Sequence, residues 1–177
     1  MIIGKTLFTT EQIQSKVIEL ANRISKDYKG KEIVMVGMLK GAFMFFADIV
    51  RHIKVPVLID FIIASSYLGT DSSGEVIIHS DLKEDIENKH IIIVDDIIDT
   101  GITMNLIRER LLMRNPASLK ICVFLDKEER RIVEVPVDYI GYKIPNEYVI
   151  GYGFDYKNNY RNLPYVAIFK KAHNKVK

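Results

Sequence analysis

Apolar runs alternate with helical patterns along this chain, and the alternation predicts an α/β fold. Short runs of aliphatic and β-branched residues predict buried strands, because strands covered by helices on both faces are apolar throughout. The expected strands lie at residues 33–37, 57–64, 76–79, 91–94 and 119–125. Apolar residues at three- and four-residue spacing predict helices over residues 10–26, 42–52 and 104–114, the first capped by Thr9 or Thr10. The pattern therefore predicts a central, mainly parallel sheet flanked by helices.

Length, composition and charge are typical of one globular domain. The chain has 177 residues, of which 48% are hydrophobic. This is enough for one hydrophobic core, and the chain is too short for two domains of typical size. No repeat, low-complexity segment or linker divides it, so we expect a single domain over residues 1–177. With 25 basic and 23 acidic residues, the net charge of +2 does not favour nucleic acid or an anionic membrane as a partner.

The ends of the chain and its cysteine carry no targeting or redox signal. The N-terminus lacks a charged start followed by a sustained apolar core, and no window of about 18 apolar residues could span a membrane. Cys122 lies inside an apolar run and is interpreted as a small core residue. We expect a cytoplasmic protein with no membrane or nucleic-acid partner, and a solvated basic tail at residues 170–177.

The most informative stretch runs from His90 to Thr103, where an apolar strand leads into acidic and hydroxylated residues. Ligands bind at the carboxyl ends of parallel strands, so Asp95 and Asp96 are predicted to face a binding site. The small or hydroxylated residues Thr100, Gly101 and Thr103 precede a helical pattern and expose backbone N–H groups at a helix N-terminus. This arrangement predicts an anion-binding turn.

A ribose 5-phosphate suits this chemistry. Two adjacent carboxylates can accept hydrogen bonds from vicinal ribose hydroxyls, and the amides and hydroxyls of the turn can donate to a dianionic phosphate. The residues predicted to hold the ribose and its phosphate are Asp95, Asp96, Asp99, Thr100, Gly101, Ile102 and Thr103. The simpler alternative, in which the aspartates only cap the helix, accounts for one of them but hardly for all three.

This stretch resembles the phosphoribosyl-pyrophosphate motif of purine phosphoribosyltransferases, and from about Ile33 to Phe169 the chain resembles the 6-oxopurine branch of that family. The resemblance implies the type I phosphoribosyltransferase fold, with a small hood subdomain over the active site formed by the N-terminal and approximately 135–165 segments. One departure is visible, because the family usually begins the motif with Glu-Asp, whereas here Asp95 precedes Asp96. A carboxylate one methylene shorter implies altered geometry rather than lost function.

The resemblance also implies a pyrophosphate loop and a mobile flap. The pyrophosphate-binding residues are Leu39, Lys40, Gly41 and Arg161, with a cis peptide between the first two. The flap residues are Ser66 and Tyr67, which close over the reacting centre and exclude water. Taken from the residues alone, both segments could be ordinary surface loops.

Residues in the last third of the chain are matched to the purine and the metal. Lys127 follows a predicted strand, and a lysine there can donate to the 6-carbonyl of a purine while rejecting the 6-amino group of adenine. By resemblance, Tyr148 stacks on the purine face and the Val149 backbone reads its edge. The implied magnesium ligands are Asp155, Asp95 and Asp96, and the implied catalytic residue near N7 of the purine is Asp99.

Structural alternatives accompany these assignments. Lys127 could belong to a solvated charged turn, and Tyr148 and Val149 could belong to a half-buried strand. The neighbouring aromatic residues are interpreted only as part of a half-buried strand: Tyr152, Phe154 and Tyr156.

The expected function is transfer of the 5-phosphoribosyl group from phosphoribosyl pyrophosphate to hypoxanthine or guanine, giving IMP or GMP and pyrophosphate, with Mg²⁺ as cofactor. Two other classes stay open: a nucleotide-sensing regulator on the same fold, and a phospho-receiver domain, whose acid pair normally follows the first strand. The resemblance implies a homodimer or homotetramer. Neither the choice between these two states nor the preference among hypoxanthine, guanine and xanthine can be read from the sequence.

Overall fold

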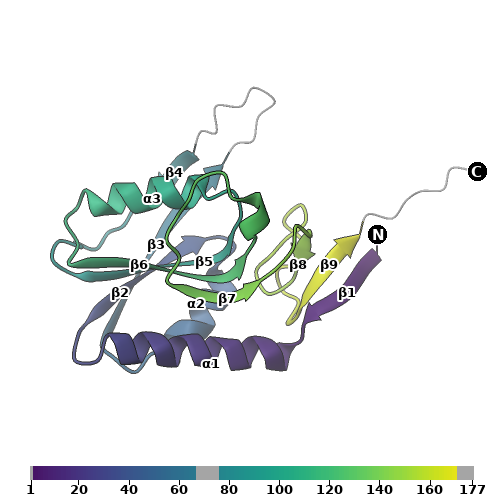
Figure 1. Cartoon of the computed structure of the whole chain (residues 1–177), viewed down its shortest axis with the longest axis horizontal. Coiled ribbons are helices and arrows are strands. Elements are labelled where there is room, and N and C mark those ends of the chain that lie inside the picture. Colours follow the sequence, from purple (N-terminus) through teal and green to yellow (C-terminus); the bar gives the residue numbers. More distant parts are fainter. Residues whose placement is uncertain (1, 67–75, 171–177) are drawn as a thin grey trace, which may run out of the picture.

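The computed structural model describes residues 2–66 and 76–170 (Figure 1). Its helices are α1 (Thr10–Asp27), α2 (Phe43–Val50) and α3 (Ile102–Leu112), with a short 3-10 helix η1 (Glu128–Arg130). Its strands are β1 (Ile2–Phe8), β2 (Ile33–Leu39), β3 (Val57–Ser66), β4 (Val76–Ser80), β5 (His90–Ile98), β6 (Ser118–Asp126), β7 (Tyr139–Lys143), β8 (Val149–Ile150) and β9 (Val166–Lys170). Every strand and helix that the hydrophobic pattern predicted is present, with shifted ends.

The large sheet has the strand order β4-β3-β2-β5-β6-β7. Its strands are parallel except for β4, which pairs antiparallel with β3. Helices α1 and α2 cover one face and α3 covers the other (Figure 1), so the sheet separates two apolar cores. The predicted α/β class and the central, mainly parallel sheet are confirmed.

Helix α1 shows how local sequence sets these elements. The Thr9 side chain accepts from the Gln12 N–H at 3.3 Å, and the Gln12 side chain accepts from the Thr9 N–H at 2.9 Å, so two of the unpaired donors at the helix start are satisfied. The residues at helical spacing that face the core are fully buried: Ile13, Val17, Leu20, Ala21 and Ile24. The predicted cap is confirmed at Thr9, and the predicted apolar face is confirmed except at Ile18, which is 42% exposed.

A second, three-stranded sheet has the order β1-β9-β8 and lies where the parallel strands of the large sheet end (Figure 1). Strand β1 was not predicted, because its pairing with β9 joins the two ends of the chain and leaves no local signal. The resemblance assigned the approximately 135–165 segment to the hood, and its two strands divide between the sheets, with β7 in the large sheet and β8 in the small one. Strand β7 joins the large sheet because it pairs in parallel register with β6, and the small sheet extends to Lys170.

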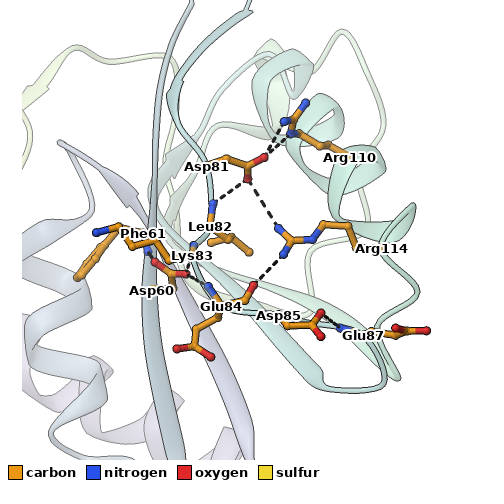
Figure 2. Close-up of polar contacts among 10 residues, drawn as sticks. All are labelled: Asp60, Phe61, Asp81, Leu82, Lys83, Glu84, Asp85, Glu87, Arg110 and Arg114. Atoms are coloured by element: carbon orange, nitrogen blue, oxygen red, sulfur yellow. Dashed lines mark hydrogen bonds and ion pairs between the residues drawn. The ribbon is translucent and has the colours of Figure 1, made fainter.

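Polar contacts tie the connection after β4 to the rest of the large sheet (Figure 2). The Asp60 carboxylate on β3 accepts from the N–H groups of Lys83 and Glu84 at 2.7 and 2.8 Å. The Asp81 carboxylate pairs with Arg110 at 2.6 Å, and the Arg114 guanidinium donates to the Glu84 carbonyl at 2.7 Å. The connection after β4 is therefore held by Arg110 on α3 and by Arg114 just beyond its C-terminal end.

Two predictions fall at or beyond the limits of the described residues. Ser66 is the last residue of β3, whereas Tyr67 and the tail at 171–177 lie outside the described residues. Within residues 2–66 and 76–170, no helix has the length and apolar character needed to cross a membrane.

Candidate active site

A cavity of about 250 Å³ lies at the carboxyl ends of β2 and β5, where loops from four parts of the chain meet. It is lined by Met38, Leu39, Lys40, Gly41, Ala64, Asp95, Asp96, Thr103, Asp155 and Arg161. Two cationic and three acidic side chains therefore face one space. The structure brings together the predicted pyrophosphate loop, the acidic pair and the predicted metal and arginine residues, which are far apart in sequence.

A second cavity of about 180 Å³ adjoins the first and shares Asp96 and Asp155 with it. It is lined by Asp96, Ile97, Lys127, Tyr148, Val149, Phe154 and Asp155. Three of these, Lys127, Tyr148 and Val149, are the residues predicted to bind the purine. Sequence reasoning missed Ile97 and assigned Phe154 only to a half-buried strand. Phe154 is buried at 5% exposure and also lines this cavity, a double role that an apolar pattern does not reveal.

The acidic pair lies inside β5 rather than after it. Pairing with β2 stops at Val94, whereas pairing with β6 continues to Ile98, so Asp95 and Asp96 are open toward the β2 loop. Burial, followed by the charge of Asp96, raises the pKa of Asp95 well above its usual range, and burial also raises the pKa of Asp96. Because the two carboxylates are adjacent, ionisation of one disfavours ionisation of the other unless hydrogen-bond donors or a cation bind to the pair.

Two glycines bring the surrounding loops into contact with this pair. A Cβ on Gly41 would stand 2.2 Å from Asp96 Oδ2, and a Cβ on Gly153 would stand 2.2 Å from the Gly41 carbonyl oxygen. Gly153 also has a φ of 100°, which L side chains rarely adopt. Backbone therefore packs directly on the carboxylate. The peptide between Leu39 and Lys40 is cis, which confirms the arrangement that the resemblance implied.

The predicted phosphate turn precedes α3 as expected, and Gly101 is its N-cap residue with a φ of 84°. Thr103 lines the larger cavity, whereas Asp99, Thr100, Gly101 and Ile102 are not among the residues that line either cavity. The Asp99 Oδ1 atom is buried, lies 3.2 Å from Arg130 Nε and accepts no hydrogen bond from the described residues. Asp99 thus has a buried carboxylate oxygen at the edge of the site whose charge is met by the Arg130 guanidinium.

Lys127 begins the loop after β6 and is 7% exposed, so it is not the solvated lysine that the neighbouring charges suggested. Burial lowers the pKa of Lys127, and the charge of Asp99 partly opposes that effect. Tyr148 is 53% exposed, and its hydroxyl donates to the Asp155 carbonyl at 2.9 Å. A buried ammonium and an open aromatic face therefore border the smaller cavity.

The Asp155 carboxylate already has two partners. Arg161 Nη2 lies 2.6 Å from Oδ1, and the Asn158 N–H donates to Oδ2 at 2.7 Å. Within the part of the chain that the structure describes, no three Asp, Glu, His or Cys side chains are grouped to hold a metal ion. The donor set fits Mg²⁺ in its commoner form, with one or two carboxylates and the oxygens of a bound phosphate ligand completing the shell.

Comparison with known proteins identifies the family to which this geometry belongs. A model of the phosphoribosyl transferase domain matches residues 4–157. The chain belongs to the phosphoribosyltransferase family. Within this family, a hypoxanthine-guanine phosphoribosyltransferase of Streptococcus mutans is 45% identical over 170 residues, 96% of this chain and 94% of that protein. A hypoxanthine phosphoribosyltransferase of Haemophilus influenzae is 49% identical over 91% of this chain and 92% of its own length.

Solved phosphoribosyltransferase structures have the same fold. The crystal structure of a hypoxanthine-guanine phosphoribosyltransferase from Bacillus anthracis superposes with a TM-score of 0.92 at 46% identity, covering 96% of this chain and 100% of that chain. These relatives confirm the resemblance to the 6-oxopurine branch and the type I phosphoribosyltransferase fold. The phospho-receiver alternative is thereby excluded.

Proposed function

We propose that the protein transfers the 5-phosphoribosyl group of phosphoribosyl pyrophosphate to hypoxanthine or guanine, forming IMP or GMP and pyrophosphate. One observation carries the proposal: two adjoining cavities share Asp96 and Asp155, the larger with Lys40 and Arg161 and the smaller with Lys127 and Tyr148. A phosphorylated sugar and a planar base would then meet at the shared residues. The names of the relatives support the same reaction. They do not favour the regulator.

The ribose and its 5-phosphate are assigned to β5 and the turn that follows it. Burial raises the pKa values of Asp95 and Asp96, so their ionised form is poorly stabilised and hydrogen bonds from ribose hydroxyls would stabilise it. The turn at residues 99–103 opens α3, so its N–H groups and the helix dipole favour a dianionic phosphate there. These residues hold the sugar while the bond at its anomeric carbon breaks.

The pyrophosphate is assigned to Lys40 and Arg161. Both cations face the larger cavity, and they would neutralise the negative charge that develops on the leaving group. Bound Mg²⁺ would supply further positive charge to the same oxygens, held by Asp155 and by Asp95 or Asp96 together with the substrate. For Asp155 to take this role, its contact with Arg161 has to loosen when the substrate enters.

The base is assigned to the smaller cavity. The buried Lys127 ammonium donates to the 6-carbonyl, and an adenine amino group in that place would leave the ammonium without an acceptor. Tyr148 stacks on the ring and the Val149 backbone reads its edge. Asp99 is assigned to the proton or hydrogen bond at N7 on the resemblance, and its ion pair with Arg130, 3.2 Å from Nε to Oδ1, has to loosen when the base enters.

A substrate panel tests this function. Purified protein is mixed with phosphoribosyl pyrophosphate, Mg²⁺ and each of hypoxanthine, guanine, xanthine and adenine, and nucleotide formation is followed by absorbance. We expect turnover of one or more 6-oxopurines and none of adenine. Xanthine has a place in the panel because a relative from Tritrichomonas foetus, 44% identical over 96% of this chain, is named a hypoxanthine-guanine-xanthine phosphoribosyltransferase. Absence of turnover by folded protein that still binds nucleotides would support the regulator instead.

We also propose that the protein is a homodimer or homotetramer, and one surface supports this. Ile59, Ile63 and Ile77 are 52%, 36% and 43% exposed and lie on one face of strands β3 and β4, at the edge of the large sheet. Exposed apolar side chains gathered in this way are typical of an interface. Light scattering of Ile59→Lys should give a smaller mass than the parent protein. An unchanged oligomer would remove this face from the interface.

A further inference from the structure

A buried arginine behind the phosphate turn has no part in the site as described so far. Arg131 lines neither cavity, yet its side chain is 7% exposed and pairs with that of Asp126, which is 5% exposed. Among the ion pairs of the described residues, this one is the most buried. Burying two charges costs desolvation energy that their attraction often fails to recover, so stability alone explains the pair poorly.

The contacts of Arg131 lead to the phosphate turn. Its Nη1 donates to the Asp99 carbonyl at 2.8 Å, while Nη2 pairs with Asp126 Oδ1 at the end of β6. The next two residues continue the attachment, because the N–H groups of Ile132 and Val133 both donate to the Thr100 carbonyl, at 2.9 and 3.0 Å. Three donors from one short segment therefore fix consecutive carbonyls of the turn.

The fit between segment and turn is close. A Cβ on Gly101 would stand 2.2 Å from the Val133 carbonyl oxygen and 3.0 Å from Arg131 Cδ. The turn thus rests directly on the arginine and the residues after it. A small displacement of this segment would move the N–H groups at the start of α3, which are assigned to the phosphate.

The same segment carries the residue assigned to the base. Lys127 follows Asp126 directly, and its N–H donates to the Ile98 carbonyl at 3.0 Å. Helix η1 then turns the chain back toward the phosphate turn. Its hydrogen bonds run from the Arg130 N–H to the Lys127 carbonyl at 3.0 Å and from the Arg131 N–H to the Glu128 carbonyl at 3.1 Å. Lys127 and the phosphate turn are therefore held in one unit, closed by the Arg131–Asp126 pair.

We propose that Arg131 is a positioning residue that fixes the separation between the base-binding Lys127 and the phosphate-binding turn. This inference rests on the proposed function, because it needs a ligand that fills both subsites. A nucleoside 5′-monophosphate does so, whereas ribose 5-phosphate and the free base each fill one. Removal of Arg131 should therefore weaken binding of the nucleotide more than binding of ribose 5-phosphate or of the free base. Each fragment can still bind its own subsite after that subsite has moved, whereas the nucleotide needs both subsites at the correct separation.

The test compares Arg131→Met with the double variant Asp126→Leu/Arg131→Met, which leaves no unpaired buried carboxylate. The matched control is Arg114→Met, because Arg114 also bridges a carboxylate and a backbone carbonyl (Figure 2), but lies beyond the C-terminal end of α3, whereas the phosphate turn precedes its N-terminus. Dissociation constants for IMP, ribose 5-phosphate and hypoxanthine, together with Tm, are measured for each protein by calorimetry.

We expect both Arg131 variants to bind the fragments within about twofold of the parent protein and IMP about 5- to 150-fold more weakly. Arg114→Met should lower Tm without changing the ratio of IMP affinity to fragment affinities. Equal losses for IMP and fragments would overturn the proposal. Failure of both Arg131 variants to fold would also overturn it, by assigning the pair to stability. If the parent protein itself binds neither IMP nor ribose 5-phosphate, the proposed function fails, which is a separate result.

Discussion

The Tyr148 hydroxyl donates to the Asp155 backbone carbonyl at 2.9 Å, so the open aromatic face of the smaller cavity is fixed by a residue that lines both cavities. The carboxylate of the same Asp155 pairs with Arg161. Base side and pyrophosphate side are therefore connected through one residue. A change at the Asp155 carboxylate should therefore alter the position of the Tyr148 ring.

Substitutions at Tyr148 separate stacking from orientation. Tyr148→Leu removes the ring, and loss of about 1–3 kcal/mol of stacking should raise KM for the base about 5- to 150-fold. Tyr148→Phe keeps the ring and loses only the hydrogen bond, worth about 0.5–1.5 kcal/mol, so a rise of about 2- to 10-fold is expected. Steady-state kinetics with varied hypoxanthine measure both. An unchanged KM in Tyr148→Leu would remove this ring from the base site.

Asp95 should reduce stability while serving activity. Its folded-state pKa is raised, so the stability that this group contributes falls as pH rises from the ordinary aspartate value through the raised one. At pH 7, Asp95→Asn should therefore raise Tm, by about 2–4 °C for each kcal/mol gained, while KM for phosphoribosyl pyrophosphate increases. The gain in Tm should shrink as the pH falls toward about 4.

Asp95→Glu is the matched control, since it keeps the charge and restores the Glu-Asp pair usual in the family. We expect it to retain activity and to show no gain in Tm. Thermal melts at pH 5 and pH 8 measure the effect. A lower Tm for Asp95→Asn at pH 8 would contradict the account of a costly buried charge.

Lys127 should give the base site an alkaline limit. Burial lowers its pKa, so the ammonium is lost at lower pH than for an exposed lysine, and KM for the base should rise as pH passes that value. Lys127→Arg stays charged in this range and should lack this part of the pH dependence. Lys127→Met should lower kcat/KM for hypoxanthine about 10- to 150-fold, the value of a hydrogen bond to a charged group. Identical pH profiles for the parent protein and Lys127→Arg would contradict the assignment.

Gly41→Ala should damage activity by displacing the loop. The added Cβ would meet the Asp96 carboxylate at 2.2 Å, so either the loop or the carboxylate has to move. A shift of about 1 Å near the reacting groups can cost about 100-fold in rate. Gly30→Ala is the comparison, because its Cβ would meet no atom within 4 Å although φ is 77°. That variant should lose some stability and keep its kcat.

The strands of the large sheet could be predicted from the sequence because they contain apolar runs such as Ile91 to Val94. The helices could be predicted because each repeats apolar residues at regular spacing. The small sheet was harder to predict from the sequence. Strand β1 pairs with residues at the other end of the chain. Strand β7 lies in the segment that the resemblance assigned to the hood, and only its parallel pairing with β6 places it in the large sheet. Such pairings are long-range properties that a local pattern does not contain.

The site was predicted in the same uneven way. The acidic pair and the turn carry a distinctive run of residue types, so Asp95 to Thr103 could be read directly. The convergence of Lys40, Lys127 and Asp155 on two adjoining cavities required the fold, and before the fold they rested on resemblance. Arg131 had no signal at all, since it stands in a charged run, and only its burial and its contacts with the turn distinguish it from its neighbours.

The most direct test of the central claim is a ³¹P NMR time course of the parent protein with phosphoribosyl pyrophosphate, hypoxanthine and Mg²⁺, beside the same mixture without base. The account predicts that IMP and pyrophosphate appear one for one, and that phosphoribosyl pyrophosphate persists when hypoxanthine is absent. Equal loss of phosphoribosyl pyrophosphate in both mixtures, with no IMP, would show that water rather than the base receives the ribosyl group and would contradict the account.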